Sequence, residues 1–140
     1  MSDHIKNSIL SSLKPLQMVF VATSFEGQPY VRPMTLINSP KGFFLATGSN
    51  DNKTRQIAVN PKVEICSLSQ NDTNSGYIRA RGILEQIIDQ DLRTSIYTEA
   101  GFLKNYWSDP SSQDYVLYKM IWLEVDFMKP GDDLAVTIPW

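Results

Sequence analysis

The sequence has very little cysteine and histidine, and this scarcity excludes several kinds of protein. Its 140 residues include one cysteine, Cys66, and one histidine, His4. A single cysteine excludes an internal disulfide framework and fits the reducing cytoplasm, where we expect the protein to reside. One histidine and one cysteine far apart lack the spacing of zinc ligands, and they form no Ser–His–acid or Cys–His pattern for hydrolysis. The sequence predicts neither a metal site nor catalytic side chains of its own.

Clusters of positive charge and long apolar runs are also absent. The 13 basic and 15 acidic residues give a formal charge of −2, and the basic residues are scattered, which argues against a nucleic-acid surface. No apolar run approaches the ~20 residues that span a bilayer, and residues 1–7 lack the pattern of a signal peptide. With 42% hydrophobic residues, the chain is expected to form a single domain over residues 1–140.

What the sequence does contain is a series of strand patterns separated by turn residues. Alternating or β-branched segments predict six strands, at about 17–24, 30–37, 42–47, 62–69, 77–88 and 115–128. The fifth strand is expected to bend at Gly82, because a missing side chain permits a bulge. Short helices are expected at about 4–14, 53–59 and 91–100, with a further turn at 102–107. This order predicts an α+β fold, mainly β, in which six antiparallel strands form a closed or nearly closed barrel.

A single arginine lies in the hairpin formed by residues 19–37. Arg32 belongs to the second strand of this hairpin, in an otherwise β-prone run. A guanidinium keeps its charge at any accessible pH and offers five forked donors, which suit a phosphate or a carboxylate. The alternative is a cross-strand or surface ion pair. The hairpin alone leaves both roles open for Arg32.

A polar loop at 48–54 follows the third expected strand and leads into a helix. The first turn of a helix has free backbone N–H groups and the positive end of the helix dipole, both of which favour an anion. Lys53 adds a full positive charge there. An ordinary connection with a solvated lysine is the alternative, since the loop lacks the glycine spacing of a phosphate-loop fingerprint.

The three tryptophans and the apolar end of the chain indicate further packing surfaces. Residues 134–140 are largely apolar, so we expect them to pack within the chain or on a partner subunit. Trp107 and Trp140 suit either a subunit interface or the core, whereas Trp122, in the middle of a strand, is expected in the core.

The order of short motifs over about residues 19–88 resembles the flavin mononucleotide (FMN)-binding split-barrel family of pyridoxamine 5'-phosphate oxidase. The resemblance is greatest to its short general-stress-protein and nitroimidazole-resistance-type members. No single motif is specific, but six occur in the right order: Ala22-Thr23 with Gly27-Gln28-Pro29, Val31-Arg32-Pro33-Met34, residues 42–47, residues 53–57, residues 60–63 and residues 78–82. The resemblance implies a six-stranded antiparallel split β-barrel with short flanking helices.

The resemblance also implies a cofactor, FMN, and the residues that bind it. It assigns the flavin phosphate to Arg32, Lys53 and Asn52 and places the ring along a strand, with cofactor-binding residues Arg32, Pro33, Met34, Thr35, Ala46, Thr47, Asn52, Lys53 and Tyr77. It implies a homodimer with flavin sites at the subunit interface. No residue of the chain is assigned a catalytic role, because the cofactor would carry the chemistry.

Departures from the family pattern argue against pyridoxamine phosphate oxidation itself. Ile37 replaces a lysine that follows the strand arginine in the oxidase, Asn52 replaces an arginine before the loop lysine, and the C-terminal arginine motif is missing. We therefore expect an FMN-dependent oxidoreductase acting on another small molecule. The alternatives are a non-catalytic stress protein that holds flavin or haem, and a deazaflavin-dependent reductase.

Overall fold

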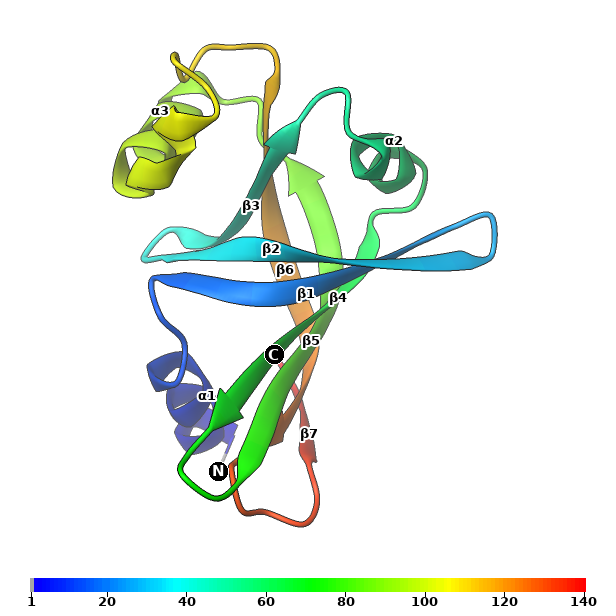
Figure 1. The fold of residues 1–140 in the computed structure, drawn as a ribbon, viewed down its shortest axis with the longest axis vertical. Helices are drawn as coiled ribbons and strands as arrows, with labels where there is room; N and C mark the ends of the chain where they lie inside the picture. Colours follow the sequence, from blue (N-terminus) through cyan, green and yellow to red (C-terminus); the bar gives the residue numbers. More distant parts are fainter. Residues whose placement is uncertain (1) are drawn as a thin grey trace.

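The computed structural model describes residues 2–140 and contains seven strands, three α-helices and one 3₁₀ helix (Figure 1). In chain order the elements are α1 (Ser2–Ser11), β1 (Leu16–Phe25), β2 (Gln28–Ser39), β3 (Gly42–Gly48), α2 (Asn52–Val59), β4 (Lys62–Gln70), β5 (Ser75–Gln86), α3 (Gln90–Glu99), η1 (Gly101–Asn105), β6 (Tyr115–Met128) and β7 (Val136–Pro139). The fold is α+β and mainly β, as the sequence predicts. None of the helices in residues 2–140 is long and apolar enough to cross a membrane.

The strands pair in the order β3-β2-β1-β4-β5-β6-β7, and a further pairing of β3 with β6 closes six of them into a ring. All pairings are antiparallel. The predicted number of six strands is wrong by one, because Val136–Pro139 pairs with β6 as a short seventh strand. A four-residue strand with mostly exposed side chains has no periodicity that a sequence pattern could reveal.

The ring is weakly joined at two positions: β1 and β4 pair only from Phe20 to Ala22, and β2 and β3 pair only from Ile37 to Ser39. By contrast, β1 pairs with β2 along its whole length through a tight turn, in which Glu26 and Gly27 both have positive φ. Two consecutive positive φ angles match the twist of a two-residue hairpin. Two short pairings, β1 with β4 and β2 with β3, therefore join the β1–β2 hairpin to the other strands, and the barrel is split at this hairpin.

The expected bend at Gly82 is confirmed. The register between β5 and β6 shifts between Arg81 and Gly82, which is the signature of a bulge. A Cβ atom at residue 82 would collide with the carbonyl oxygen of Ile121, so this close backbone approach requires glycine.

Two hydrophobic clusters hold the chain together. The larger one fills the ring of strands and includes Trp122, as predicted; the smaller one lies beneath α3 and η1 and includes Leu103 and Tyr115. Trp140 packs within the chain, with its ring 4.9 Å from that of Trp122 and beside Phe43. Of the two positions expected for Trp140, a subunit interface or the core, the structure therefore shows packing against the core.

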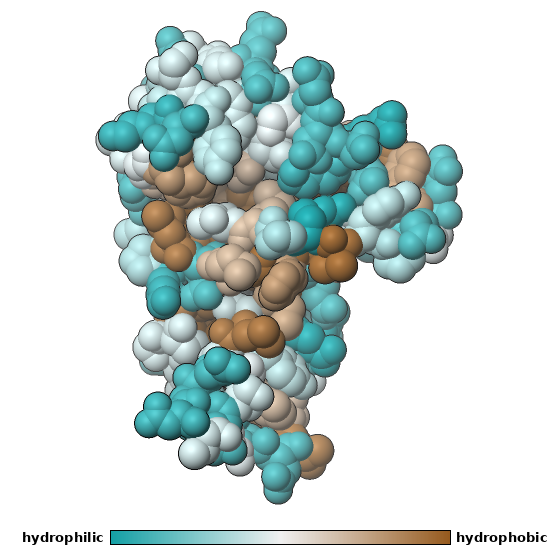
Figure 2. Space-filling view, in the orientation of Figure 1, coloured by the Kyte–Doolittle hydropathy of each residue, from teal (hydrophilic) through white to brown (hydrophobic). Residues whose placement is uncertain are grey.

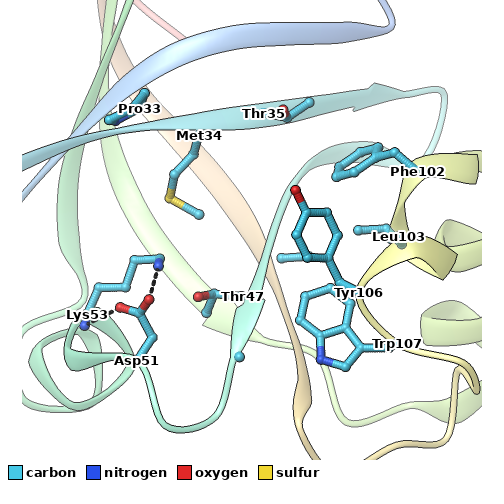
Figure 3. Close-up of a pocket in the computed structure, with 12 residues that line it drawn as sticks. Pro33, Met34, Thr35, Thr47, Asp51, Lys53, Phe102, Leu103, Tyr106 and Trp107 are labelled. Carbon is cyan, nitrogen blue, oxygen red and sulfur yellow. Dashed lines mark hydrogen bonds and ion pairs between the residues drawn. The ribbon is translucent and has the colours of Figure 1, made fainter.

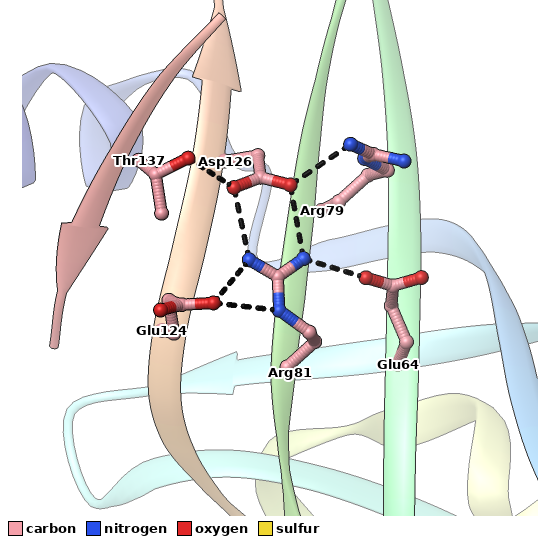
Figure 4. Close-up of polar contacts among 6 residues, drawn as sticks. All are labelled: Glu64, Arg79, Arg81, Glu124, Asp126 and Thr137. Carbon is pink, nitrogen blue, oxygen red and sulfur yellow. Dashed lines mark hydrogen bonds and ion pairs between the residues drawn. The ribbon is translucent and has the colours of Figure 1, made fainter.

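A network of five charged side chains and one threonine hydroxyl joins β4, β5, β6 and β7 (Figure 4). Its members are Glu64, Arg79, Arg81, Glu124, Asp126 and Thr137. The guanidinium of Arg81 contacts three carboxylates at 2.6–2.9 Å, and Asp126 also accepts a bond from Thr137 on β7. Hydrogen bonds from Arg81 hold the pKa of Asp126 well below its usual range, although burial opposes that shift. The network ties the seventh strand to the barrel.

Candidate functional site: a cavity between the barrel and the aromatic segment

One cavity lies between β2, β3, the start of α2 and η1, and its volume is about 390 Å³ (Figure 3). Such a volume is within the usual range for small-molecule and cofactor sites. Twelve residues line it: Pro33, Met34, Thr35, Ala46, Thr47, Gly48, Asp51, Lys53, Phe102, Leu103, Tyr106 and Trp107. The charged residues Asp51 and Lys53 lie at one end and the aromatic residues at the other, with Met34 and Thr47 between them.

The charged end is built by the residues that begin α2. Asp51 is the N-cap of this helix and accepts a hydrogen bond from the backbone N–H of Lys53, as a capping aspartate does. The Lys53 ammonium lies 2.6 Å from the other carboxylate oxygen, and the lysine side chain is only 13% exposed. Burial acts to raise the pKa of Asp51, but the hydrogen bonds and charge of Lys53, with the charge of Arg32, outweigh burial and lower it. The carboxyl group of Asp51 is therefore ionised at neutral pH.

Arg32 lies behind this charged end and does not line the cavity. Its guanidinium donates to the carbonyl of Val21 and to the hydroxyl of Thr23, at 3.2 and 2.9 Å, and to Oε1 of Gln56 at 3.3 Å. Burial lowers the pKa of Arg32, whereas the nearby carboxylate of Asp51 raises it. Its partners are neutral groups of β1 and α2, so the ion pair considered from the sequence is replaced by a set of hydrogen bonds.

The other end of the cavity is an aromatic wall, defined here as Phe102, Tyr106 and Trp107. The sequence patterns assign none of these residues to a site, although they predict a helical turn at 102–107. Leu103 anchors the segment in the smaller core, while Tyr106 is 72% exposed. The sequence does contain one indication of this wall. Three aromatic residues occur within six positions, on a short turn that can bury only one of its sides.

The structure brings six of the nine predicted site residues together: Pro33, Met34, Thr35, Ala46, Thr47 and Lys53. The other three lie outside the lining. Asn52 is the exposed first residue of α2, next to Lys53. Tyr77 is on β5 near the hairpin with β4, paired with Leu68 and Met128 and stacked against the Arg79 guanidinium. Arg32 is held by Thr23 and Gln56 as described above.

The side of the cavity formed by β2 continues into an exposed apolar face. Pro33 and Thr35 line the cavity and pair in register with Phe20 and Met18 of β1. Met18 is 58% exposed, and Val31 and Leu68 on the adjoining strands are exposed as well. Figure 2 shows apolar side chains gathered over the middle of this face, where β1, β2 and β4 lie in Figure 1.

The cavity offers few side chains for acid–base catalysis or for metal binding. The titratable groups that line the cavity in the described chain are Asp51, Lys53 and Tyr106, and the first two are paired with each other. Within residues 2–140, no three His, Cys, Asp or Glu side chains gather in a way that would hold a metal ion. The cavity is therefore suited to binding and orienting a ligand.

Comparison with known proteins identifies the family. A sequence model of the family described as pyridoxamine 5'-phosphate oxidase matches residues 5–129. No curated protein matches the chain in sequence.

Several solved structures share the fold. General stress protein 26 from Bacillus anthracis superposes with a TM-score of 0.77 at 19% identity, covering 98% of this chain and 99% of that one. A NimC/NimA family protein from Clostridium acetobutylicum gives 0.76 at 16% identity, covering 98% and 91%. A FAD-binding protein from Mesorhizobium loti gives 0.68 at 15% identity, covering 87% and 89%. At these identities the likeness shows the split-barrel fold alone, whereas the family match extends over most of the sequence. The chain therefore belongs to the pyridoxamine 5'-phosphate oxidase family.

Proposed function

We propose that the chain binds FMN in this cavity and uses it to transfer an electron pair to or from a small molecule. The observation that carries the proposal is the division of one cavity of about 390 Å³ into a charged end and an apolar, aromatic end. FMN has a matching arrangement, with a charged phosphate at one end and a planar aromatic ring at the other. When bound, FMN would supply the redox chemistry that the side chains of the cavity lack.

The charged end fits a phosphate group. A lysine ammonium has three donors, and Asp51 occupies one of those of Lys53, which leaves two for phosphate oxygens. Two cations, Arg32 and Lys53, lie near one carboxylate, so the end carries a net positive charge. Asn52, at the exposed first position of α2, would add its amide donors. In this proposal Arg32 attracts the phosphate mainly through its charge. Its N–H groups that do not donate to Val21, Thr23 or Gln56 stay available for hydrogen bonds.

The remainder of the cavity fits the planar ring. Pro33, Met34 and Thr35 present a β2 backbone edge to the cavity, and Ala46 with Thr47 forms its floor. These residues would orient the ring and exclude water from one side of it. Thr47 is buried, so its hydroxyl would be a donor or acceptor with little competition from solvent.

Pyridoxamine phosphate is a poor fit as the substrate. Among the lining residues in the described chain, Lys53 is the one cation, and in this proposal the FMN phosphate takes it. A phosphorylated substrate would need a second group of cations at the aromatic end, where the lining residues are uncharged. We therefore infer a substrate without a phosphate group.

A homodimer is part of the proposal. The exposed apolar face that includes Met18, Phe20 and Val31 adjoins the cavity through Pro33 and Thr35. Exposed apolar patches of this kind are typical of protein interfaces. Tyr77 alternates along β5 with buried Gly76 and Ile78, so its side chain belongs to the outer surface of the sheet. In the proposed dimer Tyr77 would approach the cavity of the partner subunit. We place the dimer in the cytoplasm, where a single free cysteine stays reduced.

A non-catalytic binding protein is the second candidate, favoured by the scarcity of titratable groups in the cavity. A haem-binding protein from Mycobacterium smegmatis shares the fold, with a TM-score of 0.75 at 16% identity, covering 94% of this chain and 55% of that one. A reductase that uses a deazaflavin is a further variant of the same site.

Mass spectrometry of the small molecule released on denaturing the purified protein would identify the ligand. We expect FMN, and a yellow protein whose bound flavin is bleached by NADH or NADPH without oxygen. Bound flavin that neither donor reduces would favour the non-catalytic protein. Release of haem or a deazaflavin, or failure to bind added FMN, would refute the proposal.

A further inference from the structure

The carboxylate of Asp114 joins two parts of the cavity that are far apart in the sequence. Its Oδ1 accepts hydrogen bonds from the backbone N–H and the hydroxyl of Ser49, at 3.0 and 2.7 Å. Its Oδ2 accepts a hydrogen bond from Nε1 of Trp107 at 3.1 Å. Ser49 lies in the loop before α2, and Trp107 belongs to the aromatic wall. One side chain thus contacts the supports of both ends of the cavity.

Ser49 is connected directly to the charged end. The carbonyl of Gly48, the preceding residue, accepts bonds from the backbone N–H of Asp51 and from the hydroxyl of Thr54. The backbone N–H of Ser49 also reaches the carbonyl of Asp114 at 3.0 Å. Holding Ser49 therefore holds the loop that places Asp51 and Lys53.

Trp107 is connected in the same way to the aromatic end. Its indole packs against Tyr115 with ring centroids 5.3 Å apart and against Tyr106 at 5.7 Å. Its carbonyl accepts a bond from the hydroxyl of Tyr97 at 2.6 Å. The indole N–H is the polar group of the Trp107 side chain. Its hydrogen bond to Asp114 fixes the orientation of the indole ring.

We propose that Asp114 is a positioning residue that sets the separation between the anion-binding loop and the aromatic wall, so that the wall stacks on the planar ring of the bound cofactor. The inference rests on the proposed function for the identity of that cofactor. Asp114 itself does not line the cavity and does not touch the ligand. A carboxylate suits the role because it accepts from donors on both of its oxygens, whereas an amide has one donor end.

The test compares FMN with riboflavin, which has the same ring and no phosphate, by fluorescence titration of the full chain. Asp114→Asn turns an NH₂ group toward either Ser49 or Trp107, and it should weaken the binding of both flavins by about tenfold. Trp107→Phe removes the indole N–H but keeps an aromatic ring, and it should weaken both flavins by a smaller factor. Lys53→Ala should weaken FMN alone.

Asp109→Asn is the matched control. Asp109 lies in the same loop and also accepts two hydrogen bonds, but both come from Ser111 nearby. It should bind both flavins as the unchanged chain does. A loss of thermal stability in Asp114→Asn without a change in flavin affinity would overturn the proposal, and so would a loss of FMN binding with riboflavin binding intact.

A readout without flavin separates this inference from the proposed function. In the unchanged chain the indole N–H of Trp107 should exchange slowly with deuterium, and the exchange should be faster in Asp114→Asn but not in Asp109→Asn. Equal exchange in all three proteins would refute the link between Asp114 and Trp107. A chain that binds no flavin but shows the expected exchange would refute the proposed function and leave the link intact.

Discussion

Asp51 and Lys53 form an ion pair inside the cavity, with the ammonium nitrogen 2.6 Å from one carboxylate oxygen. The other oxygen of the same carboxylate caps α2 through the backbone N–H of Lys53. The lysine that would bind an incoming phosphate is thus already partnered by an anion. A phosphate must share this lysine, and Asp51 opposes it by charge repulsion.

Replacing Asp51 by asparagine should strengthen FMN binding by about tenfold, since removal of one like charge near the phosphate is worth about 1–2 kcal/mol at an intermediate dielectric. Asparagine caps helices as well as aspartate does, so α2 should be preserved. Riboflavin affinity should not change. Isothermal titration with both ligands measures the effect. Asp89→Asn, at the N-cap of α3, is the control and should change neither affinity. Weaker FMN binding in Asp51→Asn would contradict this account of the charged end.

Replacing Arg32 by alanine should lower both stability and FMN affinity. Three hydrogen bonds to Val21, Thr23 and Gln56 are lost, and Thr23 and Gln56 are buried. We expect the free energy of unfolding to fall by about 1–3 kcal/mol. Urea unfolding and FMN titration measure the two effects. Arg55→Ala, an exposed arginine of α2, should change neither. Normal FMN affinity in a folded Arg32→Ala protein would show that the charge of Arg32 plays no part in binding.

The Asp126 network should make stability depend on pH in the acid range. The pKa of Asp126 is lowered in the folded protein by hydrogen bonds from Arg81, against the opposing effect of burial. A carboxylate whose pKa is lower in the folded than in the unfolded state stabilises the fold fully above its unfolded pKa, about 3.9. That contribution is lost as the pH falls below this value and through the folded pKa.

Urea unfolding at pH 7 and at pH 3 checks this dependence. Asp126→Asn should be less stable than the unchanged chain at pH 7, and the difference between the two should shrink at pH 3. Asp133→Asn, at an acidic residue that takes no part in the ion pairs of this network, is the control and should be as stable relative to the unchanged chain at pH 3 as at pH 7. A constant difference between Asp126→Asn and the unchanged chain would exclude Asp126 as the titrating group.

A charge on the apolar face should disrupt the proposed dimer. Met18 is 58% exposed and lies on β1 opposite Thr35, which lines the cavity. Met18→Glu should convert the dimer to a monomer, because burying a carboxylate without a partner in an interface is costly. Sedimentation velocity measures the oligomeric state, and flavin titration should show weaker binding in the monomer. Leu134→Glu, at an exposed residue outside this face, should remain dimeric. An unchanged dimer of Met18→Glu would place the interface elsewhere.

Much of the fold could be predicted from local sequence patterns. Alternating strands and the Glu26–Gly27 turn depend on residues that are neighbours in the chain, and a single glycine within a strand pattern indicated the bend at Gly82. The short motif with Pro33, Met34 and Thr35 and the loop lysine Lys53 likewise resembled a known family closely enough to identify most of one side of the cavity. The seventh strand was missed because four mostly exposed residues carry no periodic signal.

By itself, the sequence determined the class of fold, the absence of a zinc or hydrolase pattern, and six of the residues that line the cavity from β2, β3 and α2, but not Gly48 or Asp51. Tertiary structure alone decided that Phe102, Tyr106 and Trp107 face those residues, and that Asp114 reaches Ser49 from 65 positions away. It also decided the partners of Arg32, which are Thr23 and Gln56 and not a carboxylate. The physical reason is that local periodicity and turn preferences act between chain neighbours. The contacts of Asp114 and of the aromatic wall depend on how β3 and β6 close the ring, and those of Arg32 depend on how β1, β2 and α2 pack together.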